Sequence, residues 1–179
     1  METLQAIEAR KSVRSYSPKA IDPAVLGKVA ATANRAPNAG PFQITVVKNK
    51  ALLDKIDETT LTAMKNSGND FLVGRASLEG YHPLYGAPVL LLLSAVPEGY
   101  ATVNAAAAAT AVTIAATDQG LGSCYVISPL MAFDGKNELS QQLNLPAGYQ
   151  PLAGVLLGYA DGEKFFTERA TPDNVNYVE

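Results

Sequence analysis

The stretch Pro88-Val89-Leu90-Leu91-Leu92-Leu93-Ser94-Ala95 is a continuous apolar run with the length of one β-strand. A strand with one solvent-facing side alternates apolar and polar residues, whereas a strand covered on both faces does not need to. The run therefore predicts a strand in a sheet that is covered on both faces, and we take it as the centre of the fold.

Three further strands and one long helix are expected on either side of this run. The segment 43–47 is rich in β-branched residues, and the segments 123–127 and 152–159 are apolar and of strand length. The segment 100–119 is alanine-rich and predicts a buried helix whose small side chains allow another helix to approach closely. It is a candidate for the centre of the fold or of a dimer, and it is slightly short and too polar for a membrane span.

Capping residues mark the expected starts of three helices. Thr3 is the expected N-cap of a first helix that ends near residue 10. The pair Asp22-Pro23 combines a cap with a proline at the first helical position, and it begins a second helix that ends near residue 34. Asn49 is expected to cap a third helix.

Helical periodicity fades between residues 66 and 86, where glycines mix with aromatic residues and with His82. A connection of this length is uncommon unless it is functional or mobile. We therefore expect an irregular segment there. A short helix is expected around 135–143, followed by a polar tail from residue 161.

Length and composition predict a single domain over residues 1–179 with a sizeable core. The chain is 47% hydrophobic and only 17% charged, which leaves room for a buried partner interface. Apolar residues in the tail also need a surface to cover. We therefore expect a homodimer in which the C-terminal tail is exchanged between subunits.

Net charge and cysteine content restrict the partners and the compartment. The net charge of −3 gives no reason to expect nucleic acid or a membrane as a partner. Cys124 is the only cysteine, which excludes an intramolecular disulfide and fits a reducing compartment. The start, Met1-Glu2-Thr3-Leu4, has no basic region followed by an apolar one, so no secretory signal is visible and we expect a cytoplasmic protein.

The basic stretch Arg10-Lys11-Ser12-Val13-Arg14-Ser15-Tyr16 lies between the first two helices. In an extended backbone side chains alternate, so Arg10, Ser12 and Arg14 would share one face while Val13 turns toward the core. Two guanidinium groups and a hydroxyl suit phosphate oxygens, which makes the face a candidate anion clamp. The alternative interpretation is an ordinary solvated surface beside a turn.

The other motifs do not supply catalytic side chains. Gly120-Leu121-Gly122 lacks the third glycine of a dinucleotide fingerprint and lies between a helix and a strand. One histidine and one cysteine cannot build a usual zinc site, and no nucleophile-elbow pattern surrounds a serine. Cys124 lies in an apolar strand and is interpreted as a buried structural thiol. This profile favours a protein whose cofactor carries the chemistry.

Four pieces of the chain, in this order and spacing, resemble the nitroreductase family of FMN-dependent oxidoreductases. They are Ala6-Ile7-Glu8-Ala9-Arg10-Lys11-Ser12-Val13-Arg14-Ser15-Tyr16, Ala36-Pro37-Asn38-Ala39-Gly40-Pro41-Phe42-Gln43, Ala87-Pro88, and Gly120-Leu121-Gly122-Ser123-Cys124. The resemblance covers nearly the whole chain. It implies an α+β sandwich in which helices cover a central, mainly antiparallel sheet, and it favours the anion clamp over the plain surface.

The resemblance also implies roles for residues at the cofactor site. Arg10, Ser12 and Arg14 are expected to hold the FMN phosphate and the polar edge of the flavin, with Lys11 adding a backbone or charge contact. Other parts of the chain are expected to complete the site. These are Pro37, Asn38, Ala39 and Gln43, mainly from the other subunit; Ser128, Pro129 and Leu130, packing on the ring with an N–H toward N5; and Arg169, or else Lys164, at the phosphate.

The implied activity is the transfer of a hydride from NADH or NADPH to FMN and of two electrons to a nitroaromatic or quinone, by ping-pong kinetics. No metal is expected. The chain departs from the family pattern at Pro41, Ile44 and Thr45, which leaves open whether that loop gives the flavin a side-chain hydrogen bond. The second hypothesis is therefore a flavin-binding or interaction protein with little turnover, in which the segment 66–86 docks a partner.

Overall fold

The computed structural model describes residues 1–135, 137–162 and 172–178. Within this part of the chain, four strands form one sheet in the order β1-β2-β4-β3. Every neighbouring pair is antiparallel. The strands are β1 (Gln43–Val47), β2 (Val89–Ala95), β3 (Gly122–Val126) and β4 (Gln150–Gly158). The predicted antiparallel sheet and its four strands are confirmed.

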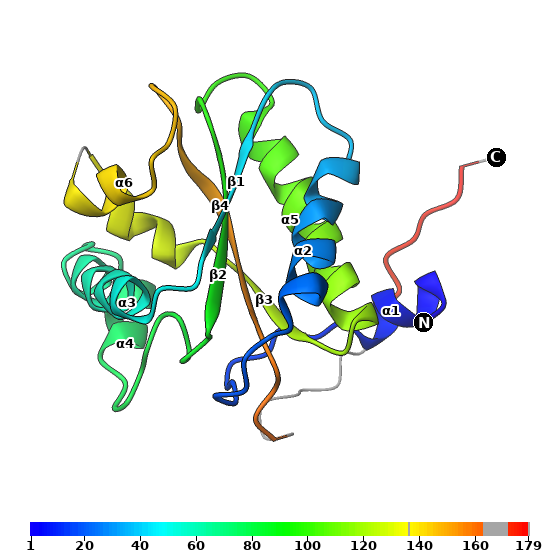
Figure 1. The fold of residues 1–179 in the computed structure, drawn as a ribbon, viewed down its shortest axis with the longest axis horizontal. Helices are drawn as coiled ribbons and strands as arrows, with labels where there is room; N and C mark the ends of the chain where they lie inside the picture. The colour runs from blue at the N-terminus through cyan, green and yellow to red at the C-terminus, as the bar shows by residue number, and fades with distance from the viewer. Residues whose placement is uncertain (136, 163–171, 179) are drawn as a thin grey trace.

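Helices cover both faces of this sheet (Figure 1). One face carries α3 (Lys50–Lys65), α4 (Asp70–Ala76), the 3₁₀ helix η2 (Ser128–Phe133) and α6 (Glu138–Gln142). The other face carries α1 (Thr3–Ala9), α2 (Pro23–Ala31), the 3₁₀ helix η1 (Thr32–Arg35) and α5 (Ala101–Asp118). The fold is therefore an α+β sandwich. In the described part of the chain, no helix has the length and apolarity needed to cross a bilayer.

Strand β2 is the centre of this sandwich, because all seven of its residues are buried. Its side chains alternate between two apolar cores. Leu90 and Leu92 share one core with Ile56 of α3. Leu91 and Leu93 belong to the other core, which includes four alanines of α5. The apolar run quoted first is thus the strand that contributes side chains to both cores.

Two of the three predicted caps are confirmed. The Asp22 carboxylate accepts hydrogen bonds from the backbone N–H groups of Ala24 and Val25, and the Asn49 side chain accepts one from Leu52. The prediction for Thr3 is wrong, because Thr3 is already helical and Glu2 occupies the N-cap position without a side-chain cap bond.

The expectation of an irregular segment at 66–86 is wrong in part, because α4 occupies 70–76. Asn69 caps this helix by accepting a hydrogen bond from the Leu72 N–H at 3.1 Å. The helix has seven residues, which is about two turns, and it contains Gly74. Two turns give too few residues for a periodic apolar pattern to stand out.

The basic stretch lies extended along the edge of β3. The Val13 N–H donates to the Ser123 carbonyl at 2.8 Å, and Ser12 forms a parallel bridge with Ser123. Val13 is 5% exposed and belongs to the core beneath it. The predicted alternation about Val13 is therefore confirmed.

Glycine at position 122 permits this contact. A Cβ built on Gly122 would lie 2.8 Å from Cγ2 of Val13. The basic stretch therefore lies closer to β3 than a side chain at position 122 would allow. We expect Gly122→Ala to lower the free energy of unfolding by about 1–3 kcal/mol, as overpacking does. The measurement is urea unfolding.

Gly27→Ala is the matched control, since Gly27 lies inside α2 with no atom within 4 Å of an added Cβ. That change is expected to stabilise the protein by about 0.5–1 kcal/mol. Equal effects of the two substitutions would contradict the close contact between Val13 and Gly122.

Candidate functional site

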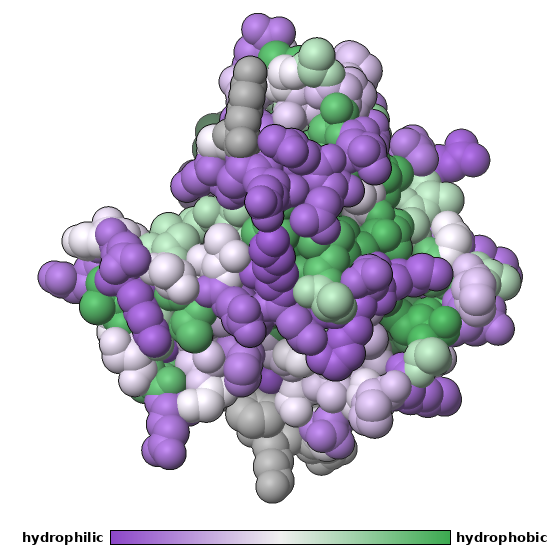
Figure 2. Space-filling view, turned by 60° about the vertical axis from the view of Figure 1, so that its left-hand side comes forward, coloured by the Kyte–Doolittle hydropathy of each residue, from purple (hydrophilic) through white to green (hydrophobic). Residues whose placement is uncertain are grey.

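A cavity of about 410 Å³ lies between β3, the basic stretch and the helices α3 and α4. Its walls combine cations, phenols, a thiol, a hydroxyl and apolar side chains, which come from Arg14, Met64, Phe71, Leu72, Arg75, Tyr81, Tyr85, Cys124, Tyr125, Val126, Ile127, Ser128 and Met131. Within the described part of the chain, no carboxylate or histidine lines this cavity. Figure 2 turns the α3, α4 and α6 side forward and shows apolar surface gathered at its centre, between hydrophilic side chains.

Arg10, Ser12 and Arg14 all lie near enough to Cys124 to act on its pKa, as expected for side chains on one face. Burial raises the pKa of the Cys124 thiol, while the charge of Arg14, a hydrogen bond with Ser12 and the charge of Arg10 act in the opposite direction. The thiol stays neutral at neutral pH, in agreement with its interpretation as a structural residue. Of these three clamp residues, Arg14 is the one that lines the cavity, next to Cys124 in the same lining.

Arg75, Tyr81 and Tyr85 form a second polar cluster in the lining of the cavity, and the sequence did not identify them as site residues. The Arg75 Nε donates to the Tyr81 hydroxyl at 3.3 Å, and its Nη2 donates to the Tyr85 hydroxyl at 2.9 Å. These two hydrogen bonds raise the pKa of Arg75. The aromatic residues of the segment 66–86 could be noticed in the sequence, but the short helix α4 that carries Arg75 could not be predicted from it.

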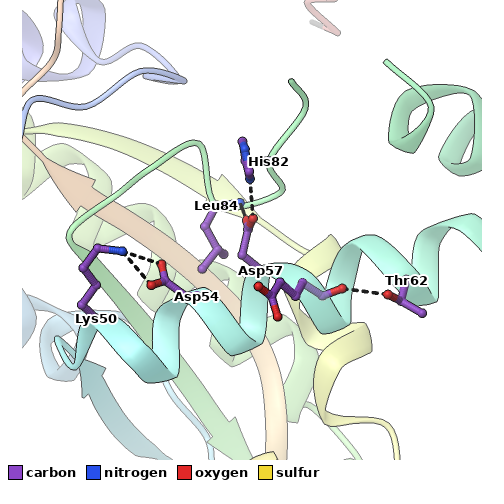
Figure 3. Close-up of polar contacts among 7 residues, drawn as sticks. Lys50, Asp54, Asp57, Thr62, His82 and Leu84 are labelled. Atoms are coloured by element: carbon purple, nitrogen blue, oxygen red, sulfur yellow. Dashed lines mark hydrogen bonds and ion pairs between the residues drawn. The ribbon is translucent and has the colours of Figure 1, made fainter. Parts of the chain in front are cut away.

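The turn that carries Tyr81 and Tyr85 is attached to α3 through Asp57 (Figure 3). One carboxylate oxygen of Asp57 accepts from the Leu84 N–H at 2.7 Å, and the other lies 2.8 Å from Nδ1 of His82. The Asp57 side chain is 14% exposed and its bond with Leu84 is part-buried, whereas the His82 side chain is 65% exposed, so the Leu84 contact is the more shielded of the two. His82, the only histidine, therefore has an anchoring contact and does not line the cavity.

We expect Asp57→Ala to lower the free energy of unfolding by about 1–3 kcal/mol, because it leaves the part-buried Leu84 N–H without a partner. Asp54→Ala is the control one turn earlier in α3, where the carboxylate is 56% exposed and paired with Lys50. That substitution should cost about 0.5 kcal/mol or less. Urea unfolding measures both, and equal losses would contradict the anchoring role of Asp57.

The segment after β3 reaches the cavity through Ser128. Pro129 is buried and Leu130 is half-buried against the core, and their predicted packing against a flavin ring stays a prediction. Proline has no N–H, and the Leu130 N–H donates to the Ile127 carbonyl at 2.9 Å. Ser128 is thus the one residue of these three whose backbone N–H has no partner in the described part of the chain.

The loop 37–39 and Gln43 lie away from this cavity in the single chain. Pro37, Asn38 and Ala39 are exposed, and the Ala39 carbonyl accepts from the Asn104 side chain at 3.2 Å. Gln43 pairs with Ser94 of β2, whereas Cys124 of the cavity lies level with Leu90 of the same strand, two strands away. Ser94 and Leu90 are four residues apart, which corresponds to about 13 Å along the strand. Their predicted approach from a second subunit stays a prediction. Arg169 and Lys164 lie outside the described residues.

The arrangement is suited to binding an anionic, partly aromatic molecule. Guanidinium groups line the cavity from the basic stretch and from α4, and phenol rings and methionines contribute apolar surface. With no carboxylate or histidine on the walls that the structure describes, the cavity lacks an evident general base. Fold and site together define an α+β protein with a cavity suited to holding a reactive group.

The chain belongs to the nitroreductase family, whose model matches residues 7–159. A relative from Archaeoglobus fulgidus, named "Putative NADH dehydrogenase/NAD(P)H nitroreductase", is 27% identical over 182 residues, which cover 98% of this chain and 97% of the relative. Two solved nitroreductase structures with bound FMN are also similar. The one from Bacteroides fragilis has a TM-score of 0.88 and the one from Desulfitobacterium hafniense 0.90, each with 27% identity and 100% coverage of both chains.

Proposed function

We propose that this protein is an FMN-dependent oxidoreductase that takes a hydride from NADH or NADPH and reduces nitroaromatic or quinone-type acceptors by two electrons. The observation that carries the proposal is that Arg14 lines a cavity to which the described residues contribute no carboxylate, while Arg10 and Ser12 lie near enough to Cys124 in the same wall to act on its pKa. Family membership and the FMN bound in similar solved structures support the same cofactor.

The donor set fits FMN. Guanidinium and hydroxyl donors suit a phosphate and the polar edge of a flavin, and Lys11 adds to the local positive charge. Tyr16 supports this fit, since its buried hydroxyl has no hydrogen-bond partner among the described residues and lies close enough to Arg14 and Cys124 for their charges to act on its pKa. Burial raises that pKa, so the phenol is neutral and can donate to a ligand.

Other residues complete the proposed FMN site. The Ser128 N–H is available as a donor toward the flavin ring, while Pro129 and Leu130 hold the segment behind it against the core. A second copy of the chain would bring Pro37, Asn38, Ala39 and Gln43 over the ring, and Arg169 would join the phosphate contacts. We therefore propose a homodimer, because the loop 37–39 does not reach the cavity of its own chain.

When bound, FMN supplies hydride acceptance at N5 and the two-electron transfer. The contribution of the chain is to position the ring and to place positive charge beside it. Arg14 stabilises the negative charge that arrives with a hydride, which lowers the energy of the transition state. Both substrates would use the same cavity in turn, so ping-pong kinetics follow. Cys124, a single cysteine, fits the reducing cytoplasm in which we place the enzyme.

The test is the visible spectrum of the purified protein, followed by stopped-flow mixing with NADH and with NADPH. We expect about one FMN per subunit and rapid bleaching of the flavin absorbance with at least one donor. A colourless protein that takes up no added FMN would contradict the proposal. Bound flavin that bleaches only with dithionite would favour the alternative, a flavin-binding or interaction protein with little turnover.

A further inference from the structure

Arg75 of α4 places a second cation in the cavity, in addition to Arg14 of the clamp. We propose that Arg75 recognises the carboxylate of an aromatic ligand, so that the acceptors preferred by this protein are aromatic acids. This inference rests on the proposed function and specifies the substrate class of the same cavity.

The first step is that Arg75 is held in place. Its guanidinium donates to two phenol oxygens and lies 5.2 Å from the centre of the Tyr81 ring, within the range of a cation–π contact. The Tyr81 and Tyr85 rings meet edge to face at 5.9 Å, which fixes the pair on which Arg75 rests. A long, flexible side chain is thereby preorganised for a ligand.

The second step is that the positive charge of Arg75 is not neutralised. Burial raises the pKa of Tyr81, so this partner is a neutral phenol at neutral pH. In the described part of the chain, no carboxylate lies within ion-pair distance of Arg75. An arginine has five N–H donors, and the phenols use two of them, so three remain for an anion.

The third step identifies the anion. Leu72, Met64 and the 71% exposed Phe71 line the cavity beside Arg75, so a ligand there meets apolar and aromatic surface as well as charge. A carboxylate matches the planar donor geometry of a guanidinium, and an aromatic ring attached to it covers the apolar wall. A strongly hydrated inorganic anion would leave that wall without a contact.

The backbone conformation of the turn also indicates that the position of the Tyr85 side chain is important. Tyr85 has a φ of +52°, a left-handed conformation that is uncommon for a bulky residue. Asp57 holds this turn through the Leu84 N–H, immediately before Tyr85. The fold thus maintains an unfavourable backbone conformation that places the Tyr85 hydroxyl against Arg75.

The experiment compares 4-nitrobenzoate with its neutral analogue 4-nitrobenzamide, using the FMN-loaded protein and Arg75→Gln. Each reduction takes a hydride from NAD(P)H and one H⁺ from the buffer, breaks one N–O bond of the nitro group and yields the nitroso compound, NAD(P)⁺ and one water molecule. We expect Arg75→Gln to lower kcat/KM for the acid by about ten- to a hundredfold, through KM, and for the amide by less than about twofold. Arg75→Lys should retain part of the preference, because it keeps the charge and loses the planar donors.

Calorimetric titration with benzoate and benzamide separates this inference from the proposed function, because binding needs no turnover. If the wild-type protein reduces neither nitro compound, the proposed function fails, and tenfold weaker benzoate binding by Arg75→Gln still supports the recognition role. Lys65→Gln, at the exposed end of α3, controls for net charge. Equal losses for acid and amide, or unchanged benzoate binding, would overturn the inference, provided that circular dichroism shows a folded variant.

Discussion

The Arg14→Ala variant is expected to retain FMN about ten- to a hundredfold more weakly than the wild-type protein. The reason is that Arg14 is a clamp guanidinium that also lines the cavity, and a hydrogen bond to a charged ligand is among the strongest single contacts a side chain can make. Reduction of the remaining bound flavin by NAD(P)H should also slow, because positive charge beside the ring is lost. Equilibrium dialysis of FMN and stopped-flow bleaching measure the two effects separately.

Lys28→Ala is the matched control, since this exposed cation lies on α2 at the opposite face of the sheet. It should leave FMN retention within about twofold, as expected for a surface charge far from the ligand. Arg14→Lys should fall between the two, because lysine keeps the charge without the planar donors. FMN retention by Arg14→Ala that equals the wild-type value would remove Arg14 from the proposed site.

The sequence is most informative where a local pattern has one physical cause. An unbroken apolar run identifies β2, because only a strand covered on both faces tolerates it. The caps at Asp22 and Asn49 precede their helices by one residue, so a short window of sequence is sufficient to find them. Alternation about Val13 also follows from strand geometry alone.

Contacts between distant parts of the chain could not be predicted from such short stretches of sequence. The alternation around Val13 could not reveal that its partner is Ser123, more than a hundred residues later. Arg75 is held in the site by Tyr81 and Tyr85, and the turn that carries these phenols is anchored by Asp57 through the Leu84 N–H, 27 residues along the chain. The family resemblance identified the clamp residues, whereas the cluster of Arg75, Tyr81 and Tyr85 was found only in the structure.

The same contacts explain how a short chain builds a cavity on a rigid base. The clamp is attached to β3 by a backbone hydrogen bond, and the wall with Arg75 is attached to α3 through Asp57. Both β3 and α3 contribute to the core that contains Leu90 and Leu92 of β2. The site is therefore only as well ordered as β2, and damage to this strand should affect folding first.

The Leu91→Ala variant is expected to lower the free energy of unfolding by about 2–5 kcal/mol, the largest stability effect among the variants considered. Leu91 is 0% exposed and faces the core that it shares with Ala105, Ala108 and Ala109 of α5. Alanines have no flexible side chain that could move into the space left by the leucine, so the cavity should persist and the cost should lie in the upper part of this range. Urea unfolding at a fixed concentration of protein and FMN provides the measurement, since both influence apparent stability.

Two further variants make this expectation specific to the core. Leu91→Met conserves volume and should cost less than about 1.5 kcal/mol. Leu78→Ala removes a leucine that is 60% exposed and should change the free energy of unfolding by about 0.5 kcal/mol or less. A loss below about 1 kcal/mol in Leu91→Ala would mean that α5 moves onto the sheet to fill the space. The small side chains of α5 would then allow a close approach to β2, and the position of this helix would be set by the leucines of β2.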